Sequence, residues 1–124
     1  MNALGTQLLL ELKDCNRVLL DDLPYIRSAL LEAAAKTGAT VIGQSFHQFS
    51  PQGVTGVVAI AESHICIHTW PEYGYAAVDI FTCGEGFQPR KAAELVVQSL
   101  ESEEHSITEI MRGILPELAG ISVS

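Results

Sequence analysis

Two segments of the chain carry apolar residues at the three-to-four-residue spacing of an amphipathic helix. The first helix is predicted over about residues 22–37, with Asp21 or Asp22 accepting hydrogen bonds from its first backbone amides. Gly38 ends it, because glycine adopts a left-handed conformation at little cost. The second helix is predicted over about residues 89–101. The positions expected to face the core are Leu23, Ile26, Leu30 and Ala34 in the first helix and Ala93, Val96, Val97 and Leu100 in the second.

The other apolar runs have the alternation and the β-branched content of strands. Pro51-Gln52-Gly53 and the segment from Pro71 to Gly74 are typical of turns between them. The strand after residue 63 has two distinct faces, because isoleucine and threonine alternate there with histidine, cysteine and tryptophan. Strands are predicted over residues 8–12, 40–49, 54–61, 64–70, 75–82 and 105–110, and the chain from Ile114 onward is expected to be loosely held.

This order of elements predicts the α+β class. Tight turns join antiparallel neighbours, because a parallel return needs a crossover of about a dozen residues. We therefore expect a two-layer structure, an antiparallel sheet with two helices on one face, in a single domain over residues 1–124. The other face of the sheet would stay bare unless a second copy of the chain covered it. That arrangement is a homodimer with an αββα sandwich.

The net charge of the chain limits the classes of partner that it is expected to bind. Of the 124 residues, 7 are lysine or arginine and 15 are aspartate or glutamate, which gives a formal net charge of -8. Such a surface repels phosphate backbones and anionic lipids, so we expect neither a nucleic-acid nor a membrane partner. It attracts cationic small molecules instead. Hydrophobic residues, at 48% of the chain, supply enough material for a packed core rather than a disordered segment.

The cellular location follows from segments that the sequence lacks and from its cysteines. The N-terminus has neither the basic start nor the apolar stretch of a signal peptide, and no segment approaches the ~20 apolar residues of a membrane span. Cys15, Cys66 and Cys83 are odd in number and widely spaced, with no Cys-x-x-Cys pair. A disulfide framework is therefore not expected, and the cytoplasm is the predicted location.

Reactive side chains crowd into the middle of the chain. Between Phe46 and Gly84 lie His47, Ser63, His64, Cys66, His68, Glu72, Asp79 and Cys83. The spacing of His64, Cys66 and His68 would point all three to one face of a strand, and imidazole and thiolate are zinc ligands. A zinc-dependent hydrolase is therefore one alternative, and a non-catalytic dimeric binding module is another. Nothing like a paired Cys-x-x-Cys supplies the remaining ligands, so no metal is expected.

The same stretch carries a resemblance to a known family. The run from Glu62 to Asp79 reads ESHICIHTWPEYGYAAVD and continues through Phe81-Thr82-Cys83-Gly84. Together with the upstream Phe46-His47-Gln48-Phe49 and the run from Pro51 to Val58, it closely resembles the small prokaryotic S-adenosylmethionine decarboxylases. The resemblance covers roughly residues 3–100 and does not extend to the tail after Ser102.

The resemblance implies a pyruvoyl-dependent carboxy-lyase, made as a zymogen that cleaves itself between Glu62 and Ser63. In that family the serine hydroxyl attacks the preceding carbonyl, and β-elimination then leaves a pyruvoyl group at the new N-terminus. Residues 1–62 would form the β chain and residues 63–124 the α chain. The pyruvoyl carbonyl forms a Schiff base with S-adenosylmethionine and accepts the electrons of decarboxylation, so no pyridoxal phosphate is required. The product, S-adenosylmethioninamine, is the aminopropyl donor for spermidine synthesis.

The resemblance also implies individual catalytic roles. Ser63 becomes the pyruvoyl group. His68 is the processing base that removes the serine α-proton during elimination, a task that suits an imidazole. Cys83 returns a proton to the substrate α-carbon after carbon dioxide leaves. Thr55 stands where the family often has serine, and it keeps the hydroxyl group that supports processing.

Four residues match substrate-binding positions of the family. Glu72 matches a carboxylate that holds the ribose hydroxyls, since a carboxylate accepts two such hydrogen bonds at once. Phe49 matches an aromatic ring that stacks on adenine, and Leu4 stands where a second apolar wall is expected. Glu62 would contribute too, because it ends the β chain near the pocket. Phe49 and Leu4 could instead be ordinary core residues.

Strand geometry constrains how such a site is assembled. Ser63 and His68 lie five positions apart, so in a regular strand their side chains point to opposite faces. The family resolves this with sites shared across a homodimer of αβ units, a heterotetramer of two α and two β chains after cleavage. One subunit would contribute Ser63, Cys83 and Leu4, and the other would contribute Phe49, Thr55, His68 and Glu72. His47 and His64 are taken as structural residues.

Overall fold

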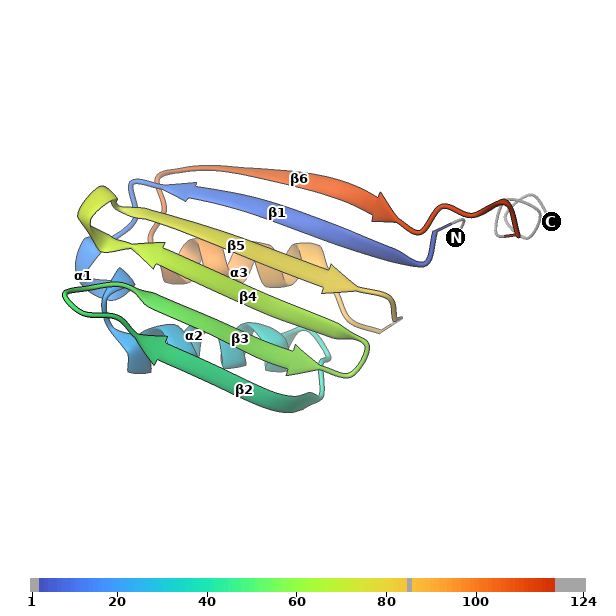
Figure 1. Ribbon diagram of the computed structural model, residues 1–124, viewed down its shortest axis with the longest axis horizontal. Coiled ribbons are helices and arrows are strands. Elements are labelled where there is room, and N and C mark those ends of the chain that lie inside the picture. The colour runs from blue at the N-terminus through green and yellow to red at the C-terminus, as the bar shows by residue number, and fades with distance from the viewer. Residues whose placement is uncertain (1–2, 85, 118–124) are drawn as a thin grey trace.

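The computed structural model describes residues 3–84 and 86–117, and within them a six-stranded sheet lies against helices (Figure 1). The strands run in the order β2-β3-β4-β5-β1-β6, and every neighbouring pair is antiparallel. The elements are β1 (Gly5–Lys13), α1 (Arg17–Leu20), α2 (Leu23–Lys36), β2 (Val41–Gln48), β3 (Val54–Ile60), β4 (Ser63–Trp70), the 3-10 helix η1 (Pro71–Tyr73), β5 (Tyr75–Thr82), α3 (Pro89–Ser99) and β6 (Glu104–Arg112).

The predicted α+β class is confirmed, because α2 and α3 both lie behind the sheet in Figure 1 and leave its front face bare. Each predicted strand and helix is present, with ends that differ by a few residues. The one-turn helix α1 was not predicted, since four residues are too few to show a helical period. Asn16 caps it through bonds to the amides of Val18 and Leu19. Of the tail expected to be loosely held, residues 118–124 lie outside the described residues.

Local chemistry explains where α2 begins and ends. The Asp22 carboxylate accepts a hydrogen bond from the Tyr25 amide at 3.0 Å, as an N-cap should. The helix ends at Lys36, where the Thr37 hydroxyl donates to the Ala33 carbonyl at 2.6 Å. Gly38 follows with φ at +83°, the left-handed conformation that glycine adopts without penalty. Both predicted signals, Asp22 at the start and Gly38 after the end, are confirmed.

The core lies between the helices and the rear face of the sheet. Alternate strand residues point into it, and each fully buried leucine, isoleucine or valine there contributes about 1.5–3 kcal/mol of transfer free energy. All the predicted inward positions of α2 and α3 are buried except Leu23, which is half-buried. The largest buried side chains include Leu8, Leu10 and Leu12 of β1, Ile65 and Ile67 of β4, Ile80 of β5, Ile26 and Leu30 of α2, and Leu100 at the end of α3.

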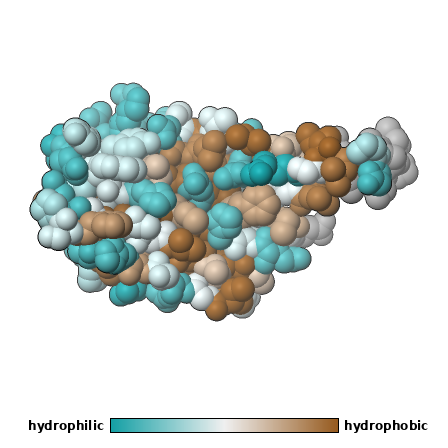
Figure 2. Space-filling model, viewed as in Figure 1, coloured by the Kyte–Doolittle hydropathy of each residue, from teal (hydrophilic) through white to brown (hydrophobic). Residues whose placement is uncertain are grey.

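The front face of the sheet mixes apolar and polar side chains, and Figure 2 views it directly. It presents Leu9 and Glu11 of β1, Val57 of β3, Cys66, His68 and Trp70 of β4, and Tyr75, Asp79 and Phe81 of β5. The Tyr75 hydroxyl donates to the Glu11 carboxylate at 2.5 Å, and burial together with this bond raises the pKa of Tyr75 to about 12. Among the described residues, no helix combines the length and the apolar character needed to cross a bilayer.

One buried hydroxyl joins three elements at the end of the sheet where β4 ends, on the left in Figure 1. Thr69 on β4 is 7% exposed, and its Oγ1 accepts the Val54 N–H of β3 and donates to the Leu20 carbonyl of α1, both at 2.8 Å. These two bonds anchor α1 to the sheet beside the loop between β2 and β3.

Replacing Thr69 with valine should therefore lower the free energy of unfolding by roughly 1–3 kcal/mol, because a buried amide and a carbonyl lose their partner. Urea unfolding followed by circular dichroism measures this change. Thr69→Ser is the matched control, since it removes a methyl group but keeps the hydroxyl. A Thr69→Val protein with an unchanged urea midpoint, or a serine variant that is less stable than the valine variant, would contradict the assignment.

Candidate active site

The turn between β3 and β4 presents an unusual peptide group. Ala61 and Glu62 form a two-residue connection, and the Glu62 backbone has φ at +63°. A left-handed conformation costs a non-glycine residue about 1–2 kcal/mol, and such positions persist only where the surrounding structure holds them. The peptide that follows this residue is the Glu62–Ser63 bond.

The carbonyl oxygen of Glu62 is held by a single neighbouring residue. The backbone N–H of Cys83 donates to it at 3.0 Å, and the Cys83 thiol donates to the same oxygen at 3.1 Å. Two donors thus converge on the oxygen of the carbonyl that precedes Ser63. Converging donors on one carbonyl oxygen are the arrangement that stabilises negative charge there when the carbonyl carbon is attacked. The family resemblance implied that Cys83 is a proton donor, but it gave no sign of this contact.

Ser63 opens β4 with its side chain on the helix-covered face. It is 9% exposed, and its hydroxyl donates to the hydroxyl of Thr82 at 2.8 Å. Ser63 and Thr82 are register partners across β4 and β5. Thr82 was part of the run that resembles the family, but its contact with Ser63 was missed because it depends on that register.

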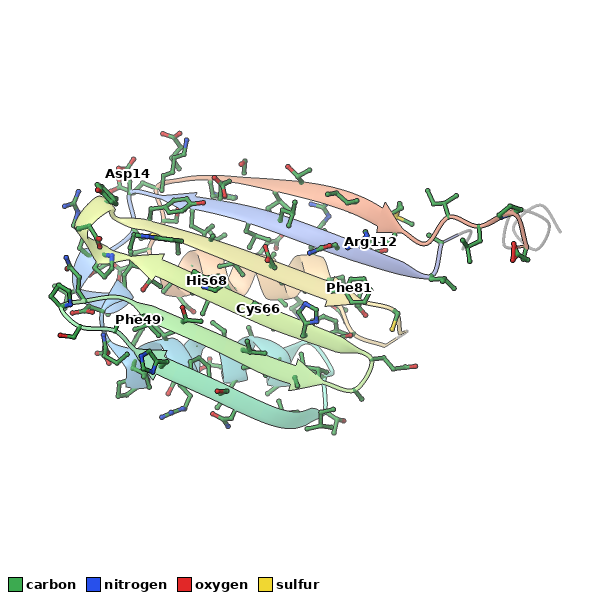
Figure 3. All side chains as sticks on the ribbon, viewed as in Figure 1. Asp14, Phe49, Cys66, His68, Phe81 and Arg112 are labelled. Carbon is green, nitrogen blue, oxygen red and sulfur yellow. The ribbon has the colours of Figure 1, made fainter. Side chains whose placement is uncertain are left out.

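A second group of polar side chains gathers at the other end of β4. The Thr55 hydroxyl lies 3.1 Å from Nδ1 of His68, across the β3–β4 ladder. Figure 3 shows Phe49 and His68 at this end of the sheet. A cavity of about 310 Å³ opens between them. Its lining comprises Phe49, Gln52, Gly53, Thr55, His68, Thr69, Trp70 and Glu72.

The backbone around Glu72 is fixed by a basic side chain from α1. Nη1 of Arg17 donates to the Glu72 carbonyl at 2.9 Å, and the Gly74 amide closes η1 on the Pro71 carbonyl. Gly74 has φ at +62°, so the turn into β5 suits glycine. The Glu72 side chain stays exposed and borders both the 310 Å³ cavity and an adjoining cavity of about 710 Å³. The larger cavity contains none of the other predicted site residues, so the smaller one is the better candidate for a ligand.

Phe49 and Leu4 are surface residues, so the alternative that they belong to the core is wrong. Phe49 is 48% exposed and Leu4 is 55% exposed. Leu4 precedes β1 at the end where Thr6 pairs with Thr82, the same end of the sheet as Ser63. An exposed aromatic ring beside a cavity and an exposed leucine at the Ser63 end of the sheet are both available to a ligand.

The structure therefore divides the predicted site residues into two groups. Ser63 and His68 stand at opposite ends of β4 and on opposite faces, as their spacing predicted. At ~3.3 Å per residue they are separated by about 17 Å along the strand. The cleavage-end group comprises Leu4, Glu62, Ser63 and Cys83, and the pocket-end group comprises Phe49, Thr55, His68 and Glu72.

The geometry around β4 does not support the alternative of a zinc site. His64, Cys66 and His68 do share the bare face, as predicted. However, the described part of the chain holds no group of three or more histidine, cysteine or acidic side chains that could bind one metal ion. Burial raises the pKa of the Cys66 thiol, and the negative charge of Asp79 raises it further. A raised pKa disfavours the thiolate that a metal requires.

Three histidines, with and without a predicted catalytic role, make aromatic contacts. His64 stacks on Phe81 with ring centroids 5.7 Å apart, and His47 meets Phe49 edge-on at 4.5 Å. His68 lies 6.5 Å from Trp70, which in turn lies 5.4 Å from Tyr75. His47 therefore supports the ring that borders the cavity, and His64 packs on the bare face.

Known proteins resemble this chain over nearly its whole length. A family model described as S-adenosylmethionine decarboxylase matches residues 6–113. The S-adenosylmethionine decarboxylase proenzyme of Thermodesulfovibrio yellowstonii is 54% identical over 115 residues, which are 93% of this chain and 85% of the relative. The protein of the same name from Clostridium tetani is 45% identical over 124 residues, 100% of this chain and 98% of the relative. The family match includes β6, which the resemblance in sequence had left out.

Solved structures share the fold as well. The crystal structure of the adenosylmethionine decarboxylase from Aquifex aeolicus matches with a TM-score of 0.86 at 35% identity, covering 94% of this chain and 97% of that chain. The AdoMetDC-delta26 monomer of Trypanosoma brucei matches with a TM-score of 0.62, covering 93% of this chain and 55% of that chain. At 17% identity the second likeness concerns the fold alone.

Proposed function

The chain belongs to the S-adenosylmethionine decarboxylase family, and we propose that it makes its catalytic carbonyl group by cleaving itself between Glu62 and Ser63. It decarboxylates S-adenosylmethionine and is synthesised as a self-processing proenzyme. The zinc-dependent hydrolase and the non-catalytic binding module find no support in the family or in the geometry. Its product is S-adenosylmethioninamine, which we infer to serve as the aminopropyl donor for spermidine synthesis.

The observation that carries the cleavage proposal is the pair of donors on the Glu62 carbonyl oxygen. When Oγ of Ser63 attacks the carbonyl carbon, negative charge develops on that oxygen. The amide and thiol of Cys83 already point at it, at 3.0 and 3.1 Å, so no reorganisation is needed during the attack. In other enzymes, removing one such donor slows the reaction on the order of 10²–10³-fold.

The processing reaction consumes no external reagent except one water molecule. A bond forms between Ser63 Oγ and the Glu62 carbonyl carbon, the Glu62–Ser63 amide bond breaks, and the hydroxyl proton passes to the Ser63 nitrogen. A base then removes the Ser63 α-proton, and the Cβ–Oγ bond breaks, so that Glu62 leaves as a carboxylate that keeps the serine oxygen. Water replaces the nitrogen of the resulting enamine, which departs as ammonia and leaves a pyruvoyl group. Residues 1–62 become the β chain and residues 63–124 the α chain.

Ser63 fits the role of cofactor precursor. It is a buried hydroxyl residue at the first position of a strand, directly after a strained turn residue whose carbonyl is polarised. The pyruvoyl group supplies the electron acceptor for decarboxylation, so neither pyridoxal phosphate nor a metal is part of the proposal. Once the Glu62–Ser63 bond is cut, Glu62 ends the β chain as a carboxylate, and the Cys83 thiol is no longer held against a peptide carbonyl. It is then free to return a proton to the substrate α-carbon.

We propose that His68 is the processing base and that it acts on the partner subunit's chain. The Thr55 hydroxyl, 3.1 Å from Nδ1, orients the imidazole ring from behind. A separation of about 17 Å along β4 prevents His68 from reaching Ser63 of its own chain. A homodimer of αβ units, with the bare faces stacked so that the strands run in opposite senses, brings the cleavage end of one subunit against the pocket end of the other. The result is the αββα sandwich.

The same dimer completes the substrate site. S-adenosylmethionine carries a sulfonium cation, an adenine ring and two ribose hydroxyls. Phe49 offers an exposed ring for stacking, and Glu72 offers a carboxylate for the ribose from the rim of the same cavity. Leu4 and Glu62 of the other subunit would close the site from the cleavage end. The net charge of -8 also favours a cationic substrate.

A cytoplasmic location belongs to the proposal as well. All three cysteines of the chain are free thiols, and only Cys15 is buried. Two accessible thiols, Cys66 and Cys83, are compatible with a reducing compartment.

Self-cleavage makes the first prediction about activity. The unaltered protein should give two polypeptides under denaturing mass spectrometry, residues 1–62 and residues 63–124. The Ser63→Ala protein should remain one chain, because it has no nucleophile, and should release no labelled carbon dioxide from carboxyl-labelled S-adenosylmethionine. Ser28→Ala, the same change at an exposed position of α2 away from the site, is the matched control and should be cleaved as the unaltered protein is. An intact chain that still releases carbon dioxide would contradict the proposal.

A shared site makes the second prediction. Ser63→Ala and His68→Ala proteins should each stay uncleaved when refolded alone. When the two are refolded together, hybrid dimers should cleave the His68→Ala chain, because the Ser63→Ala chain supplies the missing imidazole. Isotopic labelling of one variant identifies which chain is cut. Hybrid dimers that are present but uncut, or cleavage of the His68→Ala protein alone, would show that the site is not shared in this way.

A further inference from the structure

Thr82 contacts the hydroxyl group on which self-cleavage depends. Resting on the cleavage proposed above, we propose that Thr82 is a positioning residue that orients the Ser63 hydroxyl for its attack on the Glu62 carbonyl. Neither the residue types nor the resemblance in sequence gave Thr82 a role. Five hydrogen bonds at the end of β5 support this role.

The directions of the hydrogen bonds are fixed by the donors available. Thr82 Oγ1 accepts the Gly84 N–H at 3.3 Å and lies 3.5 Å from the Gly84 carbonyl oxygen, to which its own proton is directed. A hydroxyl has one proton, so toward Ser63 the Thr82 oxygen is an acceptor. The Ser63 proton therefore points at Thr82 over 2.8 Å. Among the described residues this is the one hydrogen bond that the Ser63 hydroxyl makes, so its lone pairs remain free.

This contact is buried, which strengthens its orienting effect. Ser63 and Thr82 are 9% and 7% exposed, and they face each other as register partners on the helix-covered side of the sheet. Water competes poorly for a hydroxyl in such a place. Fixing the serine rotamer removes part of the entropic cost of reaching the attack geometry.

Two consecutive residues, Thr82 and Cys83, thus hold the two reacting groups in place. Thr82 holds the nucleophilic oxygen of Ser63, and Cys83 holds the carbonyl oxygen of Glu62 through its amide and thiol. Gly84 lies close to the same turn, since a Cβ at its position would come within 3.2 Å of the Glu62 Cβ. The end of β5 acts as a clamp across the Glu62–Ser63 bond, where clamp means residues 82–84.

The clamp should affect one chemical step only. During the acyl shift, the Ser63 Oγ–C bond forms, the Glu62 C–N bond breaks, and the hydroxyl proton moves to the Ser63 nitrogen. Thr82 gains and loses no atom in this step. The later elimination starts from the Ser63 α-proton and depends on His68, so Thr82 should have no direct part in it.

The test isolates the acyl shift by blocking the elimination. In a His68→Ala background the ester should accumulate, and neutral hydroxylamine should cut it after residue 62 and expose an N-terminal serine. Adding Thr82→Val, which keeps the shape but removes the hydroxyl, should slow this fragmentation about tenfold, in proportion to one lost hydrogen bond. Adding Thr82→Ser should restore the rate to within a few-fold of the parent. Urea unfolding of each variant checks that the fold is equally stable.

The outcomes separate this inference from the proposed function. Slow fragmentation with Thr82→Val, rescue with Thr82→Ser and matching urea midpoints support the positioning role. Equal fragmentation rates in the valine variant and its parent overturn that role while leaving self-cleavage intact. A lower urea midpoint with no rescue by serine also overturns it, because it indicates a structural effect. If even the His68→Ala parent and the unaltered protein never fragment, the cleavage proposal itself fails.

Discussion

The proposed self-cleavage depends on the hydrogen bonds that hold the Glu62 carbonyl group against Cys83. A peptide bond in a β-turn is ordinarily inert, because amide resonance makes its carbonyl a poor electrophile. Here the oxygen is held by an amide and a thiol at 3.0 and 3.1 Å, and the residue itself has φ at +63°. The adjacent Ser63 hydroxyl is buried and oriented. A polarised carbonyl, a strained backbone conformation and an oriented nucleophile therefore all lie at the Glu62–Ser63 bond.

The register between β4 and β5 brings these groups together. Antiparallel pairing of β4 with β5 sets Ser63 opposite Thr82, and the next residue after β5 is then in reach of the turn before β4. A slip of one residue would move every side chain to the other face of the sheet. The register is held by the buried isoleucines of β4 and β5, so the packing of the core determines the geometry of the cleavage site.

Distance within β4 is the reason for proposing a site shared between two chains. β4 carries Ser63 at its first residue and His68 near its far end, on opposite faces. No side-chain movement spans that separation, so the shared site proposed above draws on a second subunit across the bare face. The front face seen in Figure 2 mixes apolar and polar side chains, and on it the half-buried Tyr75 donates a hydrogen bond to the exposed Glu11. The two-helix, one-sheet architecture therefore keeps the two groups of predicted site residues apart within each chain.

Much of the fold could be predicted from the sequence, and less of the site. Capping by Asp22, the glycine after α2 and the alternation in β4 are local signals, and each one is found in the structure. The opposed faces of Ser63 and His68 followed from strand period alone. The roles of single residues came from the resemblance to a family. The contacts of Thr82 with Ser63 and of Cys83 with Glu62 join residues about twenty positions apart, and they depend on a strand register that no local pattern fixes. The short helix α1 lacked enough residues to show a period.

The central proposal is that the polypeptide converts its own Ser63 into a pyruvoyl group, whose keto carbonyl is absent from an ordinary serine. Reaction of the denatured protein with phenylhydrazine, followed by mass spectrometry, measures that group directly. The account predicts that the fragment of residues 63–124 gains one phenylhydrazine with loss of water, while the fragment of residues 1–62 is unchanged. A fragment that begins with an ordinary serine and does not react, or a chain that is never cut, would contradict it.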